Sequence, residues 1–304
     1  MDLLSQLPVS LRQLQYLVAV ADLGGFRRAA EACHVSQPSL SAQVAQAEHD
    51  LGVQIFERDR RGVRLTPAGE ALVEQARRVL LAAGDLRELA RHAADPFRGT
   101  LRIGAIPTVC PYLLPDIAPA LARAFPALTV VWSEERTGQL VTQLQAGAID
   151  AALLALGPEV GPFEHAVLGR DPFVLAARPD HPLVRPSRPA DPSVLNGATV
   201  LLLDDGHCLR EQALDVCARA GAGELDVRAT SLATLVQMVS SGTHVTLLPS
   251  LAVSVENRRG QLRVRPFRKP SPARTLVLAW RKGSAVREPM GRIAEVVRKA
   301  ARLG

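Results

Sequence analysis

The chain has few of the residues on which secreted, metal-binding or membrane proteins depend. Among its 304 residues are only four cysteines and three lysines, and aromatic residues make up 4%. It contains no run of eighteen apolar residues, so we expect no membrane-spanning helix. The N-terminus lacks a basic segment followed by an apolar block, and we expect no signal peptide. No Cys-x-x-Cys pair or cysteine–histidine cluster occurs, so we predict neither a metal nor another cofactor.

These absences predict a cytoplasmic protein, where a transient disulfide is more plausible than a permanent one. The apolar fraction of 47% excludes disorder, and the length suffices for two or three domains. The net charge of +6 is uneven, because residues 1–95 carry −1, residues 96–257 carry −5 and residues 258–304 carry +12. The basic excess therefore lies outside the segment that we assign to DNA below, and overall charge does not argue for nucleic-acid binding.

Residues 10–66 have the pattern of a helix-turn-helix unit. Apolar spacing predicts helices over 11–23 and 26–33, and Ser36 is expected to cap a third helix that runs to Asp50. Two short helices joined by a tight turn, the second opening with polar residues, are typical of DNA-binding motifs. Residues 55–66 are expected to form a basic hairpin that contacts DNA phosphate or the minor groove. The candidate DNA-contacting residues are Ser36, Gln37, Pro38, Ser39, Ser41, Arg58, Arg60, Arg61 and Arg64. A three-helix packing unit with a solvated basic loop is the structural alternative.

The rest of the chain predicts a linker helix and an α/β domain. Residues 67–95 contain a long amphipathic helix, typical of an antiparallel dimerisation arm. From residue 100, strands alternate with helices, which predicts a two-lobed α/β domain with parallel strands, of the periplasmic-binding-protein type. We therefore divide the chain into a winged helix-turn-helix domain, a linker helix and a regulatory domain. Their bounds are 1–66, 67–95 and 96–304, with lobe I at about 96–169 and 276–304 and lobe II at about 170–275.

The segment from Asp204 to Cys217 holds two cysteines nine residues apart. The residues between them favour a helix, along which nine residues rise roughly 13 Å. A disulfide needs Cα atoms within about 7 Å, so Cys208 and Cys217 can bond only if the helix unfolds locally. A dithiol of this kind is a two-state switch. Cys208 is expected at the helix N-terminus, which favours a thiolate. The alternative is two buried cysteines that act as small hydrophobes.

Polar residues follow three of the predicted strands. Thr108 follows the first strand, Thr137 the second, and the turn at His207 and Cys208 follows a strand of the second lobe. Ligand sites in α/β folds lie at the carboxyl ends of strands. We therefore expect these residues to face one cleft.

Two long segments resemble the LysR-type transcriptional regulators, and the resemblance covers the full chain. They are LRQLQYLVAVADLGGFRRAAEACHVSQPSLSAQVAQAEHDLG and FERDRRGVRLTPAGE. The segments IPTVCPYLLP, DDGHCLREQALDVC, RATSLATLVQMV and TLLPSLAV resemble the peroxide-sensing members of that family. The resemblance implies a homotetramer, a dimer of dimers, that binds an extended operator in double-stranded DNA and contacts RNA polymerase. It further implies hydrogen peroxide as the signal, antioxidant genes as targets and reset by cellular thiol reductants.

The same resemblance implies roles for single residues. Cys208 matches the peroxidatic cysteine and Cys217 the resolving one, with His207 beside the reactive sulfur. Thr108 and Thr137 match polar residues that position peroxide in the family, and Arg274 matches an arginine that supports the thiolate. The chain departs from the family at two places. Cys110 stands where Gly is usual, and residues 45–47 lack the usual basic residue and leucine of the recognition helix.

Three functions are compatible with the sequence. The first is a peroxide-responsive DNA-binding regulator, which predicts different operator footprints in its two redox states. The second is a regulator of the same fold that senses a small metabolite in the inter-lobe cleft, with silent cysteines. The third is a thiol peroxidase that uses Cys208 and Cys217, which the helix-turn-helix pattern argues against. We therefore predict a regulator rather than an enzyme.

Overall fold

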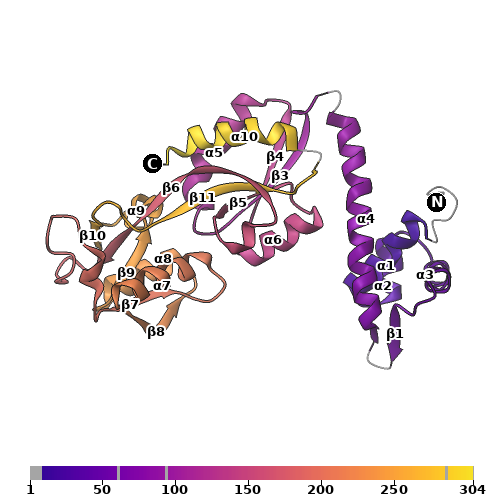
Figure 1. Ribbon diagram of the computed structural model, residues 1–304, viewed down its shortest axis with the longest axis horizontal. Coiled ribbons are helices and arrows are strands. Elements are labelled where there is room, and N and C mark those ends of the chain that lie inside the picture. The colour runs from indigo at the N-terminus through magenta and orange to yellow at the C-terminus, as the bar shows by residue number, and fades with distance from the viewer. Residues whose placement is uncertain (1–8, 60–61, 93–94, 285–286, 304) are drawn as a thin grey trace. The chain divides into compact units, whose positions relative to one another are not determined.

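The computed structural model describes residues 9–59, 62–92, 95–284 and 287–303 (Figure 1). Contacts within the chain divide it into two compact units, residues 1–90 and residues 91–304. We describe each unit by itself. Within the described residues, every helix is too short or too polar to cross a lipid bilayer.

The N-terminal unit is a helix-turn-helix followed by a hairpin and a long helix. Its elements are α1 (Leu11–Leu23), α2 (Phe26–Ala32), α3 (Gln37–Leu51), β1 (Phe56–Asp59), β2 (Gly62–Leu65) and α4 (Pro67–His92). Ser10 and Gln13 form a reciprocal capping box at the start of α1, and Ser36 caps α3 as predicted. Helix α2 ends one residue earlier than predicted, so Cys33 is its half-buried C-cap residue rather than part of the helix.

The C-terminal unit is built on one nine-stranded sheet. Its strands are β3 (Gly99–Ala105), β4 (Leu128–Glu134), β5 (Ala151–Ala155), β6 (Glu164–Ala177), β7 (Thr199–Leu203), β8 (Gly223–Ala229), β9 (Val245–Pro249), β10 (Arg263–Pro266) and β11 (Ala273–Trp280). Their order is β4-β3-β5-β11-β6-β9-β7-β8, and β10 pairs with β6. The helices are α5 (Cys110–Ala124), α6 (Thr137–Ala146), α7 (Cys208–Ala220), α8 (Leu232–Ser241), α9 (Ser250–Glu256) and α10 (Arg287–Ala301). Two 3₁₀ turns, η1 (Pro158–Val160) and η2 (Pro192–Leu195), complete it.

The sheet is mixed, and our expectation of an all-parallel sheet is wrong. Strands β3, β4 and β5 are mutually parallel, as are β7, β8 and β9, but β6 and β11 pair antiparallel with each other. Strand β6 is the longest of these strands, with 14 residues from Glu164 to Ala177. These two strands run through the middle of the sheet and join its two halves.

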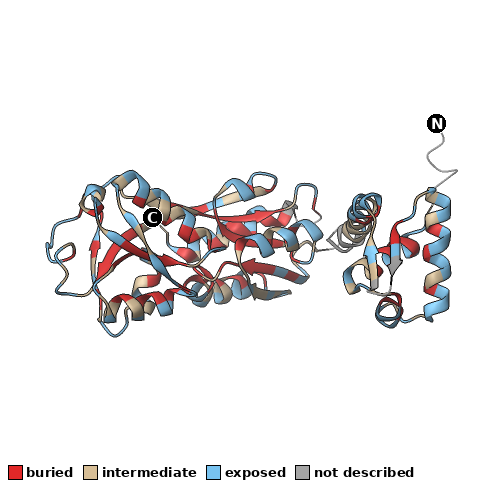
Figure 2. Cartoon of the chain, turned by 90° about the horizontal axis from the view of Figure 1, so that it is seen from below, coloured by how far each residue is buried: buried red, intermediate tan, exposed pale blue. Residues whose placement is uncertain are grey.

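Each half of the sheet has its own hydrophobic core, and these two cores define lobe I and lobe II. The first core includes Ile103, Leu113 and Leu153 and is covered by α5, α6 and α10. The second includes Leu201 and Val239, under α7 and α8. Most residues of the central strands are buried, as Figure 2 shows. The two-lobed α/β fold predicted from the sequence is thus confirmed.

Candidate functional site

The carboxyl ends of β3, β4 and β7 surround a small, closely packed hollow that is too narrow in this conformation to admit a water-sized sphere. Its lining residues are Ile106, Pro107, Thr108, Arg136, Thr137, Gly206, His207 and Cys208. Four of the six residues that we selected for the redox site are therefore brought together, and they come from both lobes. The hydroxyl of Thr137 and Nε2 of His207 are buried without a hydrogen-bond partner. Unpartnered buried polar atoms are rare and are commonly served by a ligand or water, so this hollow, once slightly widened, suits a very small polar molecule.

Arg274 reaches this hollow only through Thr108 and is not part of its lining. The Arg274 guanidinium is buried, and it donates to the Thr108 hydroxyl at 2.8 Å and to the Thr108 carbonyl at 2.7 Å. Its Nε donates to Asp171 at 2.9 Å, and the other oxygen of this carboxylate accepts from the Leu251 N–H at 3.0 Å. Charge-assisted hydrogen bonds therefore hold Arg274, Asp171 and Thr108 together. Arg274 thus fixes Thr108, and through it one side of the hollow.

The two cysteines of α7 lie in different surroundings. Cys208 is the first residue of the helix, half-buried and packed against the core of lobe I, whereas Cys217 is 2% exposed in the core of lobe II. Both are free thiols. Because α7 is continuous between them, their separation of roughly 13 Å precludes a disulfide in this conformation. The structure therefore corresponds to the reduced state of the predicted pair.

Burial changes the chemistry of the remaining thiols near the site. It raises the pKa of Cys217 to about 11, with a further contribution from the Glu224 carboxylate. Cys110 opens α5, and its pKa is also raised to about 11 by burial and by the nearby carboxylate of Glu134. Cys110 lies in the core of lobe I and is not among the residues lining the hollow, so it has the surroundings of a packing residue.

We expect alkylation to distinguish these thiols. At pH 8, a group with a pKa of about 11 is thiolate in roughly one molecule in a thousand. Iodoacetamide should therefore label the half-exposed Cys208 well before Cys217 and Cys110. Time-resolved mass spectrometry of the folded chain measures this order, with the half-buried Cys33 as the internal control. Equal labelling rates at Cys208 and Cys217 would show that the burial of Cys217 is not maintained in solution.

The turn before α7 is held by Arg136, which sequence reasoning missed. Arg136 directly precedes α6 in lobe I, and its guanidinium donates to the Asp205 carbonyl at 2.9 Å and to the Asp204 carboxylate at 3.1 Å. Gly206 follows in the left-handed region, with φ +87°. The only signal available in the sequence was the position of Arg136 next to Thr137, at the end of a strand.

His207 is buried beside this contact, and its environment favours the neutral imidazole. Burial and the positive charge of Arg136 lower the pKa of His207, opposed by Asp204 and by a backbone hydrogen bond with Thr230. Nε2 lies 3.1 Å from an oxygen of Asp204, but the geometry does not make a hydrogen bond. A neutral His207 leaves Nε2 available to a ligand in the hollow.

A second charged cluster fixes the first turn of α7 to β8. Arg210 is 6% exposed; it donates to Asp205 at 3.0 Å and, through both terminal nitrogens, to Glu224. Arg228 also pairs with Asp205 and Glu224. The reduced conformation of the helix is therefore held by the charge-assisted bonds of the buried Arg210 as well as by packing.

The candidate DNA-contacting residues of α3 present a polar surface. Gln37, Pro38 and Ser39 are exposed, and Ser41 is half-buried. The Ser36 hydroxyl accepts from the Ser39 N–H at 3.4 Å, so it caps the helix in this structure. In the hairpin, Arg64 on β2 is exposed. Arg60, Arg61 and the side chain of Arg58 lie outside the described residues.

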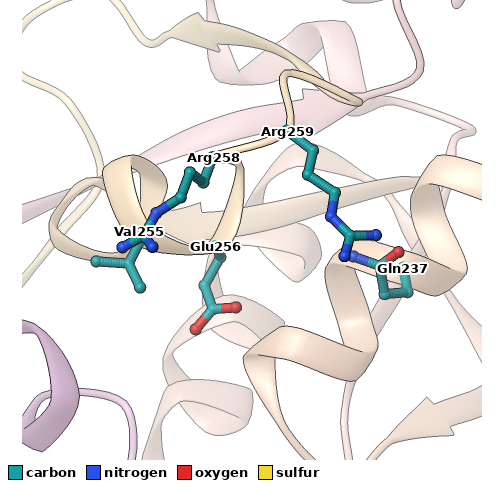
Figure 3. A pocket seen from close by; sticks show the side chains of 5 residues that line it. All are labelled: Gln237, Val255, Glu256, Arg258 and Arg259. Carbon is teal, nitrogen blue, oxygen red and sulfur yellow. The ribbon is translucent and has the colours of Figure 1, made fainter.

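A larger hollow of about 650 Å³ lies between α8 and the end of α9 (Figure 3). It is lined by Gln237, Val255, Glu256, Arg258 and Arg259. Glu256 accepts a hydrogen bond at 2.6 Å from the hydroxyl of Tyr112, a residue of α5. The lining contains no thiol and none of the residues selected from the sequence.

Comparison with known proteins identifies both units. The bacterial regulatory helix-turn-helix family of LysR type matches residues 11–70, and the LysR substrate binding domain matches residues 94–302. The hydrogen peroxide-inducible genes activator of Dickeya chrysanthemi is 47% identical over 96% of this chain and 95% of its own length. The chain belongs to the LysR family, in its OxyR group. The dual regulator OxyR of Escherichia coli K12 is 46% identical over 95% of both chains.

Solved OxyR structures share the fold. A full-length OxyR variant from Pseudomonas aeruginosa is 38% identical, with a TM-score of 0.77 over 96% of this chain and 95% of that chain. Structures of the reduced and the oxidised form of OxyR match with TM-scores of 0.63 and 0.62, at 41% and 43% identity. Each covers 68% of this chain, and this chain covers 98% and 97% of them, respectively.

Proposed function

We propose that this chain is a DNA-binding transcription regulator that hydrogen peroxide switches through a reversible Cys208–Cys217 disulfide, and that it controls antioxidant genes. One observation carries the proposal. Cys208 borders a hollow with two unpartnered buried polar atoms, while its partner thiol lies nine residues away on the same helix, in the other core. The OxyR relatives named as peroxide-inducible activators support the same assignment.

In the first step, a slight widening of the hollow would let it hold peroxide against the sulfur of Cys208. The hydroxyls of Thr108 and Thr137 and Nε2 of His207 offer hydrogen bonds to its two oxygens. The Cys208 thiolate attacks one oxygen, the O–O bond breaks, and the leaving hydroxide takes a proton to become water. Cys208 is then a sulfenic acid. Arg274 acts through Thr108, whose position it fixes.

In the second step, Cys217 resolves the sulfenic acid. The start of α7 unwinds, the Cys217 sulfur attacks that of Cys208, and a second water leaves as the S–S bond forms. The charged cluster around Arg210 must rearrange, because it holds the same turn in the reduced state. Two electrons from a cellular thiol reductant reverse the reaction.

The N-terminal unit would bind the operator. Gln37, Pro38, Ser39 and Ser41 at the start of α3 would face base edges, and the hairpin arginines would contact phosphate or the minor groove. These arginines are Arg58, Arg60, Arg61 and Arg64.

An apolar hollow of about 470 Å³ between α1 and α4 supports dimerisation, and Leu11 and Leu86 are 49% and 70% exposed. We further propose a cytoplasmic homotetramer that contacts RNA polymerase.

The size of the hollow favours peroxide over a metabolite. Sites for small organic ligands usually measure about 300–1,000 Å³. The hollow beside Cys208 is too narrow in this conformation to enclose a water-sized sphere, so a metabolite would need a much larger rearrangement of its walls than peroxide would. The remaining alternative is a thiol peroxidase, which would reduce peroxide repeatedly with thioredoxin as reductant. We expect no such turnover, apart from the slow reduction of the disulfide that resets the regulator.

Footprinting tests the regulatory proposal. An operator selected from random DNA by the reduced chain should be protected over a different length after peroxide treatment. Gln37→Ala should weaken binding of that operator about tenfold, because a base-edge contact is lost. Gln46→Ala is the matched control, since Gln46 is exposed farther along α3 and bonds to Asp50. An identical footprint in the two redox states would refute the switch.

A further inference from the structure

We propose that Arg136 is a positioning residue that clamps the Cys208 turn onto lobe I, and that the two steps of peroxide sensing respond to it in opposite directions. The inference rests on the proposed function. Arg136 belongs to lobe I, directly before α6, whereas its partners Asp204 and Asp205 belong to the turn between β7 and α7 of lobe II. In the sequence, Arg136 is 68 positions away from Asp204 and 69 positions away from Asp205.

The contact is specific rather than a loose surface ion pair. One terminal nitrogen of Arg136 donates to the Asp205 carbonyl at 2.9 Å, and the other donates to both carboxylate oxygens of Asp204, at 3.1 Å and 3.4 Å. A fork of this kind fixes direction as well as distance. The turn also fits closely around it, because a Cβ at position 206 would lie 3.0 Å from the Arg136 nitrogen.

The clamp has a direct consequence for Cys208. Residues 204–206 lead straight into α7, so a guanidinium that holds them to lobe I also holds Cys208 against the core of lobe I. The hydroxyls of Thr108 and Thr137 lie on that side of the hollow. Peroxide meets all of these groups at once only while the clamp is closed. Arg136 therefore accelerates sulfenic acid formation.

The same contact opposes the second step. To bond with Cys217, the sulfur of Cys208 must leave lobe I and move toward the core of lobe II, where Cys217 is buried. The turn cannot make that movement while Asp204 and Asp205 remain bound to Arg136. Release of the clamp is thus part of disulfide closure, and Arg136 slows it.

Two rate measurements on the full-length chain test the proposal. In the Cys217→Ser background, which stops at the sulfenic acid, trapping and mass spectrometry measure the first step. Arg136→Ala should slow it roughly fivefold, an effect in the range of a lost half-exposed charge-assisted pair. With Cys217 present and peroxide saturating, the same substitution should speed disulfide closure roughly fivefold. Arg136→Lys keeps the charge and should restore both rates in part.

Variants on either side of the contact make the result decisive. Asp204→Asn weakens the clamp from lobe II and should change both rates in the same two directions, which covers the case in which Arg136→Ala does not fold. Arg259→Ala, in the hollow of Figure 3, removes an exposed arginine elsewhere and should change neither rate. Changes of the same sign in both steps, or no change in either, would overturn the clamp. A parent protein that forms no sulfenic acid at Cys208 would instead overturn the proposed function, and the clamp with it.

Discussion

Replacing Cys208 by serine is expected to abolish the response to hydrogen peroxide. A serine hydroxyl does not ionise near neutral pH and does not reduce peroxide, so the first step should slow by on the order of a thousandfold or more. The hollow and the intact α7 remain, because the half-buried Cys208 contributes little else to the core. The variant should stay in the reduced conformation, with the footprint of the reduced protein at every peroxide concentration.

Two companion variants separate the roles of the thiols. Cys217→Ser should still react with peroxide but stop at the sulfenic acid on Cys208, which mass spectrometry detects as one added oxygen. Cys33→Ser, in the other unit, should behave as the parent chain. A Cys208→Ser protein that still changed its footprint with peroxide would show that another group senses the oxidant.

Removing the carboxylate of Asp171 is expected to have the largest effect on stability. Asp171 and Arg274 form an ion pair whose side chains are 1% and 0% exposed. Asp171→Ala leaves the guanidinium buried with one partner fewer and removes the acceptor of the Leu251 N–H. Breaking a buried pair from one side costs about 3–5 kcal/mol. Urea denaturation should show this loss in the transition of the C-terminal unit.

A matched exposed pair provides the control. Asp215 and Arg219 are neighbours on α7, with side chains 61% and 78% exposed. Asp215→Ala should change the free energy of unfolding by about 0.5 kcal/mol or less, as exposed pairs contribute little. If Asp171→Ala also cost less than about 1 kcal/mol, Arg274 would not be the buried anchor of Thr108 that we describe. The variant should in addition react more slowly with peroxide, because Thr108 loses its fixed position.

Local signals in the sequence were enough to predict the elements that carry the site. Ser10 and Ser36 mark helix starts, and both cap as expected. The unbroken run of helix formers between Cys208 and Cys217 predicts α7, and the carboxyl ends of three strands meet at one hollow. The helix starts and α7 depend on neighbouring residues, which is why periodicity and capping patterns identify them. The meeting of the strand ends follows from the general rule for α/β folds.

The contacts that complete the site depend on residues far apart in the sequence. Arg274 pairs with Asp171 across 103 residues, and Arg136 reaches Asp204 across 68. Nothing in the local pattern distinguishes these arginines from the many exposed ones. For the same reason, the antiparallel course of β6 and β11 was missed, since strand direction is set by the partner strand. The small size of the hollow follows from packing and has no sequence signal.

Peptide mass mapping after one equivalent of hydrogen peroxide, with free thiols blocked, tests the central claim most directly. We predict a Cys208–Cys217 disulfide that dithiothreitol reverses, with Cys33 and Cys110 left as thiols. Because α7 separates the two sulfurs in the reduced structure, that bond would also demonstrate the unwinding of the helix. Recovery of Cys208 and Cys217 as free thiols would contradict the redox switch and direct attention to a small ligand between the lobes.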